Sequence, residues 1–154
     1  MIRVTVYNEG LHEKTSDSVR AVYPEGIHGA LKKGLESDEI SVRTVTLDDL
    51  PDGLSQQVLD ETDVLIWWGH MAHEKVPDEV VDRVQQSVLK GMGAIFLHSG
   101  HHSKPFRRLR HMENSLWIHL LFQKWQNMSP YTVSRIIIFQ ITAVQNCLNA
   151  VLLY

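Results

Sequence analysis

The chain has 154 residues, a net charge of −3, 44% apolar residues and 21% charged residues. This length suits one domain with a buried core, and the composition excludes a disordered, collagen-like or coiled-coil protein. The sequence has no basic stripe, so nucleic acid is not an expected partner, and its single cysteine excludes an intrachain disulfide.

The first 110 residues alternate strand and helix patterns. Short β-branched or apolar runs predict strands at 2–7, 40–47, 63–68 and 93–97. Amphipathic runs that each begin at a proline predict helices over 24–35 and 77–90, and the second carries four valines on one face. Strands that alternate with helices of this length predict an α/β fold with a parallel sheet and flanking helices.

Residues 111–154 have a different composition from residues 1–110. All nine glycines and all nine aspartates precede residue 101, and no charged residue follows Arg135. We therefore divide the chain into an α/β domain, 1–110, and an atypical apolar tail, 111–154. Because the first residues lack the apolar stretch of a signal peptide, we expect a cytoplasmic protein.

Polar and titratable side chains cluster directly after three of the predicted strands. Ligands bind beyond the carboxyl ends of the strands in an open parallel sheet, so these positions are the candidate site. The side chains are, in chain order, Asn8, Glu9, His12, His70, His73, His98, Ser99, His101 and His102.

Histidines at this edge are compatible with more than one chemistry. Three neutral imidazoles and a water form a catalytic zinc site, and His70, His98 and His101 are the candidate ligands for a divalent metal such as zinc. A histidine could instead act as a general acid or base, or be only a hydrogen-bonded loop residue. Glu9 could orient an imidazole or bind a sugar hydroxyl group.

Other residues have a structural and a functional interpretation side by side. Trp67 and Trp68 could stack on a sugar, although the strand pattern places at least one of them in the core. His28, near the start of the first helix, could face the pocket or the surface, and we prefer the surface. A short basic run is either a solvated helix face or an anion site; it comprises Lys104, Arg107, Arg108 and Arg110.

Four segments in the same order resemble the ThuA-like, trehalose-utilisation family. They are Tyr7-Asn8-Glu9 with His12-Glu13-Lys14, then 22–28, 67–73 and 97–101. The resemblance covers about residues 1–109. It implies the flavodoxin-like sheet of the class I glutamine amidotransferase-like superfamily, in the order 2-1-3-4 and incomplete at its C-terminus. It also implies a role in carbohydrate utilisation, with keto-sugar chemistry as a plausible activity.

The resemblance and the residues together give a set of candidate roles. Members of the superfamily that hydrolyse glutamine place a cysteine on a sharp strand-to-helix turn, where this chain has His98, so we predict no glutaminase activity. We assign catalytic roles to Glu9, His12, His98 and His101. We assign substrate binding to Asn8, His28, Trp68, His73 and Ser99.

The apolar tail leaves three interpretations open. We favour a truncated product whose tail comes from a shifted reading frame, over a C-terminal membrane anchor at 136–154 or a soluble helical extension. Amide side chains interrupt residues 136–154, which disfavours the anchor. A four-stranded sheet with an unpaired edge would favour a homo-oligomer. The expected partner is a small-molecule carbohydrate, and the alternatives to an enzyme are a non-catalytic sugar-binding or regulatory module and an inactive fragment.

Overall fold

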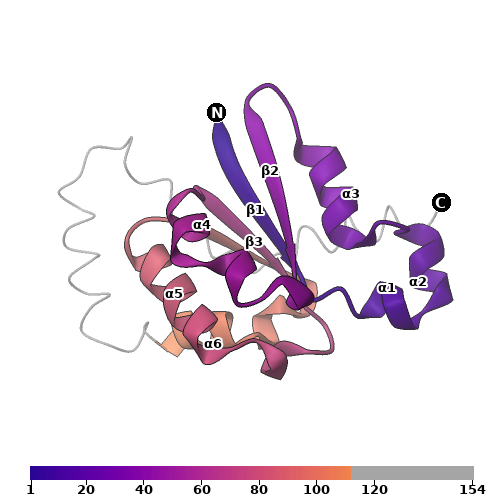
Figure 1. The fold of residues 1–154 in the computed structure, drawn as a ribbon. Helices are drawn as coiled ribbons and strands as arrows, with labels where there is room; N and C mark the ends of the chain where they lie inside the picture. The colour runs from indigo at the N-terminus through magenta and orange to yellow at the C-terminus, as the bar shows by residue number, and fades with distance from the viewer. Residues whose placement is uncertain (112–154) are drawn as a thin grey trace.

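A four-stranded parallel sheet organises residues 1–111, which are the residues that this computed structural model describes. The strands are β1 (Ile2–Asn8), β2 (Ile40–Thr46), β3 (Val64–Trp68) and β4 (Gly93–Leu97). Their order across the sheet is β2-β1-β3-β4, which confirms the predicted order (Figure 1). The predictions for the apolar tail concern residues outside the described range.

Helices cover both faces of the sheet (Figure 1). One face carries α3 (Gly26–Leu35), and the opposite face carries α4 (Gln56–Asp60) and α5 (Asp78–Leu89), with α6 (Lys104–His111) packed against α5. Two short helices, α1 (His12–Thr15) and α2 (Asp17–Val22), follow β1. Single turns of 3₁₀ helix lie at Leu47–Asp49, Asp52–Leu54, His73–Lys75 and His98–His102.

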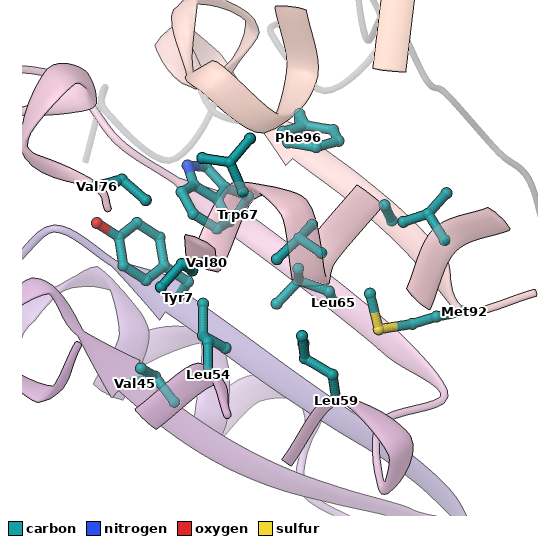
Figure 2. Close-up of a cluster of buried hydrophobic side chains, with 14 residues drawn as sticks. Tyr7, Val45, Leu54, Leu59, Leu65, Trp67, Val76, Val80, Met92 and Phe96 are labelled. Carbon is teal, nitrogen blue, oxygen red and sulfur yellow. The ribbon is translucent and has the colours of Figure 1, made fainter. Parts of the chain in front are cut away.

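The larger core lies between the sheet and α5 (Figure 2). The strand register aligns Val45, Tyr7, Trp67 and Phe96 across neighbouring strands, so their side chains share one face. The Tyr7 and Trp67 rings stack with centroids 3.9 Å apart. The predicted valine face of α5 is buried against this row, as expected for an amphipathic helix. Trp67 is therefore a core residue, which confirms the structural interpretation for this tryptophan.

The opposite face of the sheet has a smaller core beneath α3. Val4, Val6 and Ile66 are buried there, and Leu31 and Leu35 of α3 pack against them. β1 and β3 bury side chains on both faces, and the sequence of β3 is accordingly a continuous apolar run. This double coverage fixes the sheet, and with it the positions of the loops that follow the strands.

The structure adds local features that the sequence patterns do not indicate. Helices α1 and α2 have four and six residues and bury none of them, so they carry no apolar periodicity. The helix predicted to begin at Pro24 begins instead at Gly26. These features lie between β1 and α3, at the carboxyl edge of the sheet, where the candidate site is.

Candidate functional site

The strand register brings three loops to one edge of the sheet. Asn8 at the end of β1 is paired with Trp68 at the end of β3, and Trp68 is paired with Leu97 at the end of β4. The residues that follow these strand ends therefore start from one line across the sheet. The register therefore places the three loops at this edge, and the individual side chains take different positions within it.

Ser99 connects two histidines from neighbouring loops, and we call Ser99, His70 and His98 the Ser99 cluster. The Ser99 hydroxyl group donates to the Gly69 carbonyl oxygen at 2.7 Å. His70 Nδ1 and His98 Nδ1 lie 2.9 and 3.0 Å from the same hydroxyl oxygen. Because that hydroxyl has a single hydrogen, which points to Gly69, both imidazoles must donate from Nδ1. Their neutral forms then carry an unshared pair on Nε2, where each can accept a proton or bind a ligand.

The imidazole rings of His70 and His98 lie close together. Their centroids are 5.6 Å apart, which agrees with the expected separation of about 5–6 Å for two neighbouring site histidines. The His12 ring stacks on the His70 ring with centroids 5.0 Å apart. The ring of Trp68, the last residue of β3, has its centroid 6.1 Å from that of His70. The Ser99 cluster thus borders an aromatic group supplied by β3 and an imidazole supplied by α1.

His98 has an unusual backbone conformation. Its φ is +48°, in the left-handed region that a residue with a side chain seldom adopts. Such a residue costs about 1–3 kcal/mol and is held only where the surroundings determine it. His98 is the residue at which β4 ends and the 3₁₀ helix begins. The constrained backbone therefore belongs to the same residue as the candidate imidazole. Burial lowers the pKa of His98, and the nearby His70 and His101 lower it further.

His101 does not join the other two imidazoles in a metal-binding group. Its Nδ1 lies 2.8 Å from the His98 carbonyl oxygen, which can only accept, so Nδ1 donates. Its ring packs against His102, with centroids 3.9 Å apart. Within residues 1–111, no three His, Cys, Asp or Glu side chains are arranged to hold a metal ion. The metal assignment to His70, His98 and His101 stays a prediction.

Glu9 lies beneath the loop after β3, where its side chain is enclosed and not open to the edge of the sheet. Its side chain is buried, and its two carboxylate oxygens accept hydrogen bonds from the backbone N–H groups of Met71 and Ala72 at 2.6 and 2.9 Å. Among residues 1–111 no imidazole is hydrogen-bonded to it, and the catalytic assignment stays a prediction. The geometry supports a structural function, since Glu9 holds the chain that carries His70.

His73 also lies under this loop and not at its rim. Both of its ring nitrogens are buried and have no hydrogen-bond partner among residues 1–111. Burial lowers the pKa of His73, an effect that the nearby Glu9 carboxylate opposes. A side chain at Gly69 would come within 3.2 Å of His73 Nδ1 and 3.4 Å of Glu9 Oε2, so glycine permits the close approach. Its assignment to substrate binding stays a prediction.

A second polar group brings together side chains from β1, α1 and α3. Its members are Asn8, Glu13 and His28, and we call them the Asn8 cluster. The Asn8 side-chain amide donates to Glu13 Oε1 at 2.7 Å and contacts His28 Nδ1 at 2.8 Å. The Asn8 side-chain oxygen accepts from the Gly10 N–H at 3.1 Å, which fixes the orientation of the amide. His28 Nδ1 must therefore accept, so neutral His28 carries its hydrogen on Nε2.

The preferred surface position for His28 is wrong, because this side chain is only 21% exposed and its Nδ1 is hydrogen-bonded to the Asn8 amide.

Gly26 shows how closely the Asn8 cluster is packed. Its φ is +71°, and a side chain there would collide with Glu13 Oε1 and lie 2.7 Å from His28 Nδ1. Glycine at this position satisfies both the backbone conformation and the lack of space.

The Asn8 cluster borders a cavity of about 330 Å³ at the start of α3. Glu13 is a lining residue that sequence reasoning missed, although it lies inside one of the motif segments. Its partners Asn8 and His28 come from β1 and α3, so no local spacing connects the three. The lining residues are Gly10, Glu13, Lys14, Arg20, Pro24, Glu25, Gly26, His28 and Thr46.

Most of the basic run on α6 forms ion pairs with acidic residues. Lys104 lies 2.9 Å from Asp78, and its ammonium group also donates to the Val76 carbonyl oxygen. Two further pairs join α6 to neighbouring elements, namely Arg107 with Glu74 and Arg108 with Asp82. These three side chains attach α6 to α5 and to the turn before it, and Arg107 and Arg108 do so at the solvent-exposed surface.

No helix within residues 1–111 is long and apolar enough to cross a membrane. The alternative of an anchor at 136–154 lies outside the described residues.

A comparison with known families identifies this chain. A comparison with curated proteins finds no match. The family model for ThuA, described as trehalose utilisation, matches residues 3–133, which is most of the chain. The match reaches into the apolar tail, beyond the limit near residue 109 that the motifs indicated, and the origin of the tail stays a prediction. With the parallel α/β fold described above, the chain belongs to the ThuA trehalose-utilisation family.

Proposed function

We propose that this protein acts on a keto derivative of trehalose or of a related disaccharide, with His70 and His98 as proton-accepting groups. The observation that carries this proposal is the shared hydrogen bonding of the two imidazoles to Ser99. It directs both Nδ1 hydrogens into the protein and leaves both Nε2 atoms as acceptors. Family membership supports the carbohydrate class of the substrate.

Neutral imidazoles at this position suit proton transfer to and from a sugar. A keto group acidifies the neighbouring C–H bond, and a histidine can accept that proton through Nε2 while the electron pair moves toward the carbonyl oxygen. The lowered pKa of His98 keeps this imidazole neutral at neutral pH. Ser99 holds the ring by its other nitrogen, so the accepting atom has a fixed direction.

A divalent metal such as zinc is a second, separable part of the proposal. The donor atoms are suitable, because metal-bound histidines usually donate their other N–H to a neighbouring group, as His70, His98 and His101 do. The arrangement of the three rings does not fit a metal ion in the described residues, so the proton transfer above is argued without one.

Turnover of a keto-disaccharide by the purified full chain tests the proposal. We expect His98→Gln to reduce turnover by about 10²- to 10⁴-fold, the usual contribution of a positioned acid or base. His102→Gln is the matched control, since His102 is an exposed histidine of the same 3₁₀ turn outside the Ser99 cluster. Equal losses in both variants would contradict the assignment.

Two further outcomes separate the alternatives. Saturable binding of the sugar without turnover would favour a non-catalytic sugar-binding module, and absence of both would overturn the proposed function. Loss of turnover with a chelator, followed by its recovery with zinc, would support the metal. The same chelator experiment on His101→Gln asks whether that imidazole is a ligand.

A further inference from the structure

The cavity beside the Asn8 cluster is separate from the Ser99 cluster but adjoins it through α1. His12, the first residue of α1, stacks on His70 of the Ser99 cluster. The next residue, Glu13, belongs to the Asn8 cluster and lines the cavity. One short helix therefore borders both groups, and a ligand of two linked rings could contact one group with each ring.

The Asn8 cluster presents an acceptor next to a donor. Asn8 engages Glu13 through Oε1, so the carboxylate retains acceptor capacity on Oε2. His28 accepts from Asn8 through Nδ1 and therefore has an N–H at Nε2. Glu13 Oε1 and His28 Nδ1 are 3.8 Å apart, so the two side chains lie next to each other. A sugar hydroxyl group both donates and accepts, and two neighbouring hydroxyls complement such a pair.

The charges around the cavity disfavour an anionic ligand. Glu13 and Glu25 contribute acidic groups, and Lys14 and Arg20 contribute basic groups. Both cations form ion pairs outside the Asn8 cluster, Lys14 with Asp48 and Arg20 with Asp17. The acidic side chains therefore disfavour an anionic ligand, whereas the hydroxyl groups of a polyhydroxyl compound can donate to these carboxylates.

We propose that Glu13 and His28 bind hydroxyl groups on the second ring of the disaccharide, while the first ring lies at the Ser99 cluster. This inference rests on the proposed function and adds a specificity site to it. The cavity of about 330 Å³ is at the lower end of the range for small-molecule sites, which suits one sugar ring. The Asn8 cluster thus makes the protein selective for a disaccharide over a monosaccharide.

The test compares keto-disaccharide and keto-monosaccharide as substrates of the full chain. Glu13→Gln should raise KM for the disaccharide by about 10- to 100-fold, the range for a lost hydrogen bond to a charged group, with kcat little changed. The kcat/KM for the monosaccharide should stay within about twofold of wild type. Glu36→Gln, at the far end of α3, is the matched control and should alter neither substrate.

Equal losses on both substrates would overturn the inference, because they would indicate a general structural effect. Since Glu13→Gln could impair folding, His28→Gln is the second variant, and both are checked by circular dichroism melting. If neither substrate is turned over, the proposed function fails, and binding of trehalose and glucose is compared by NMR titration. A trehalose preference that Glu13→Gln abolishes would support the second-ring site, and an unchanged preference would overturn it.

Discussion

The Ser99 cluster and the Asn8 cluster use the same residue type in opposite ways. In the Ser99 cluster, a hydroxyl oxygen accepts from two imidazoles and leaves them with accepting Nε2 atoms. In the Asn8 cluster, an amide donates to the imidazole and leaves His28 with a donating Nε2–H. The partner of Nδ1 therefore decides whether a histidine is prepared to take a proton or to give a hydrogen bond.

Removing the amide of Asn8 should have the largest effect on stability. Asn8→Leu keeps a similar volume but leaves the part-buried Glu13 carboxylate and His28 without their donor. We expect the free energy of unfolding to fall by about 3 kcal/mol, because each buried group left without its partner costs about 1–3 kcal/mol. Urea unfolding monitored by circular dichroism measures this loss.

Ser99→Ala is the corresponding change in the Ser99 cluster and serves as the comparison. The Ser99 hydroxyl group also has three partners. His70 is exposed, however, so it can replace the lost hydrogen bond with one to water. The loss of stability should be smaller, with Ser87→Ala as a control for removing a buried hydroxyl group from α5. A larger loss for Ser99→Ala than for Asn8→Leu would reverse the comparison.

The left-handed residues of the two regions give a second prediction, of about 1 kcal/mol. Near the Asn8 cluster the left-handed residues are glycines, Gly10 and Gly26, whereas in the Ser99 cluster the left-handed residue is His98. His98→Gly should be more stable than His98→Ala by about 1 kcal/mol, because only alanine keeps the strained Cβ. Both variants lack the imidazole, so their difference isolates the backbone.

His101 provides the control for this backbone effect. It lies in the same 3₁₀ turn and lacks a positive φ, so His101→Gly should be less stable than His101→Ala. Thermal unfolding of the four variants gives both differences. If glycine is disfavoured at position 98 as well, the strain assigned to His98 is absent.

Acid should have a smaller and graded effect on stability. Burial lowers the pKa of His98 and of His73 below the ordinary value of about 6.5, which the unfolded chain retains. The unfolded state then binds protons first, so stability is complete above about pH 6.5 and falls as the pH drops through the lowered pKa values. Urea unfolding between about pH 7.5 and 5 measures the slope, and His73→Leu should reduce it.

Nitrogen-15 NMR of the histidine rings extends this experiment to each region. His98 accepts its proton on Nε2, so its bond to Ser99 persists in acid. In the Asn8 cluster the same spectra should show the hydrogen of neutral His28 on Nε2, because Nδ1 accepts from the Asn8 amide. Stability that is constant across the pH range would show that neither His73 nor His98 is held neutral by the fold.

Much of the fold could be predicted because its causes are local in the sequence. The apolar runs of β3 and β4 and the valines of α5 repeat with the periods of strand and helix, and the structure has them as expected. The parallel order of the strands follows from the helices that connect them. Helices α1 and α2 escaped prediction because they bury no side chain.

The candidate site was harder to predict because its partners are distant in sequence. Glu9 and Glu13 are both acids that follow β1. Glu9 is buried and accepts hydrogen bonds from the N–H groups of Met71 and Ala72, whereas Glu13 faces a cavity. Nothing near either glutamate in the sequence distinguishes them. The position of His28 likewise depends on Asn8, twenty residues earlier, and on the absence of a side chain at Gly26.

The central place of β1 has a consequence for how the sheet can assemble during synthesis. β2 joins one edge of β1, β3 joins the other edge, and β4 then joins β3. The partner of each strand has therefore been synthesised before that strand leaves the ribosome. No strand has to insert between two strands that are already paired with each other. The sheet can grow outward from its first strand in the order of translation, which limits the time that any strand edge waits for a partner synthesised later.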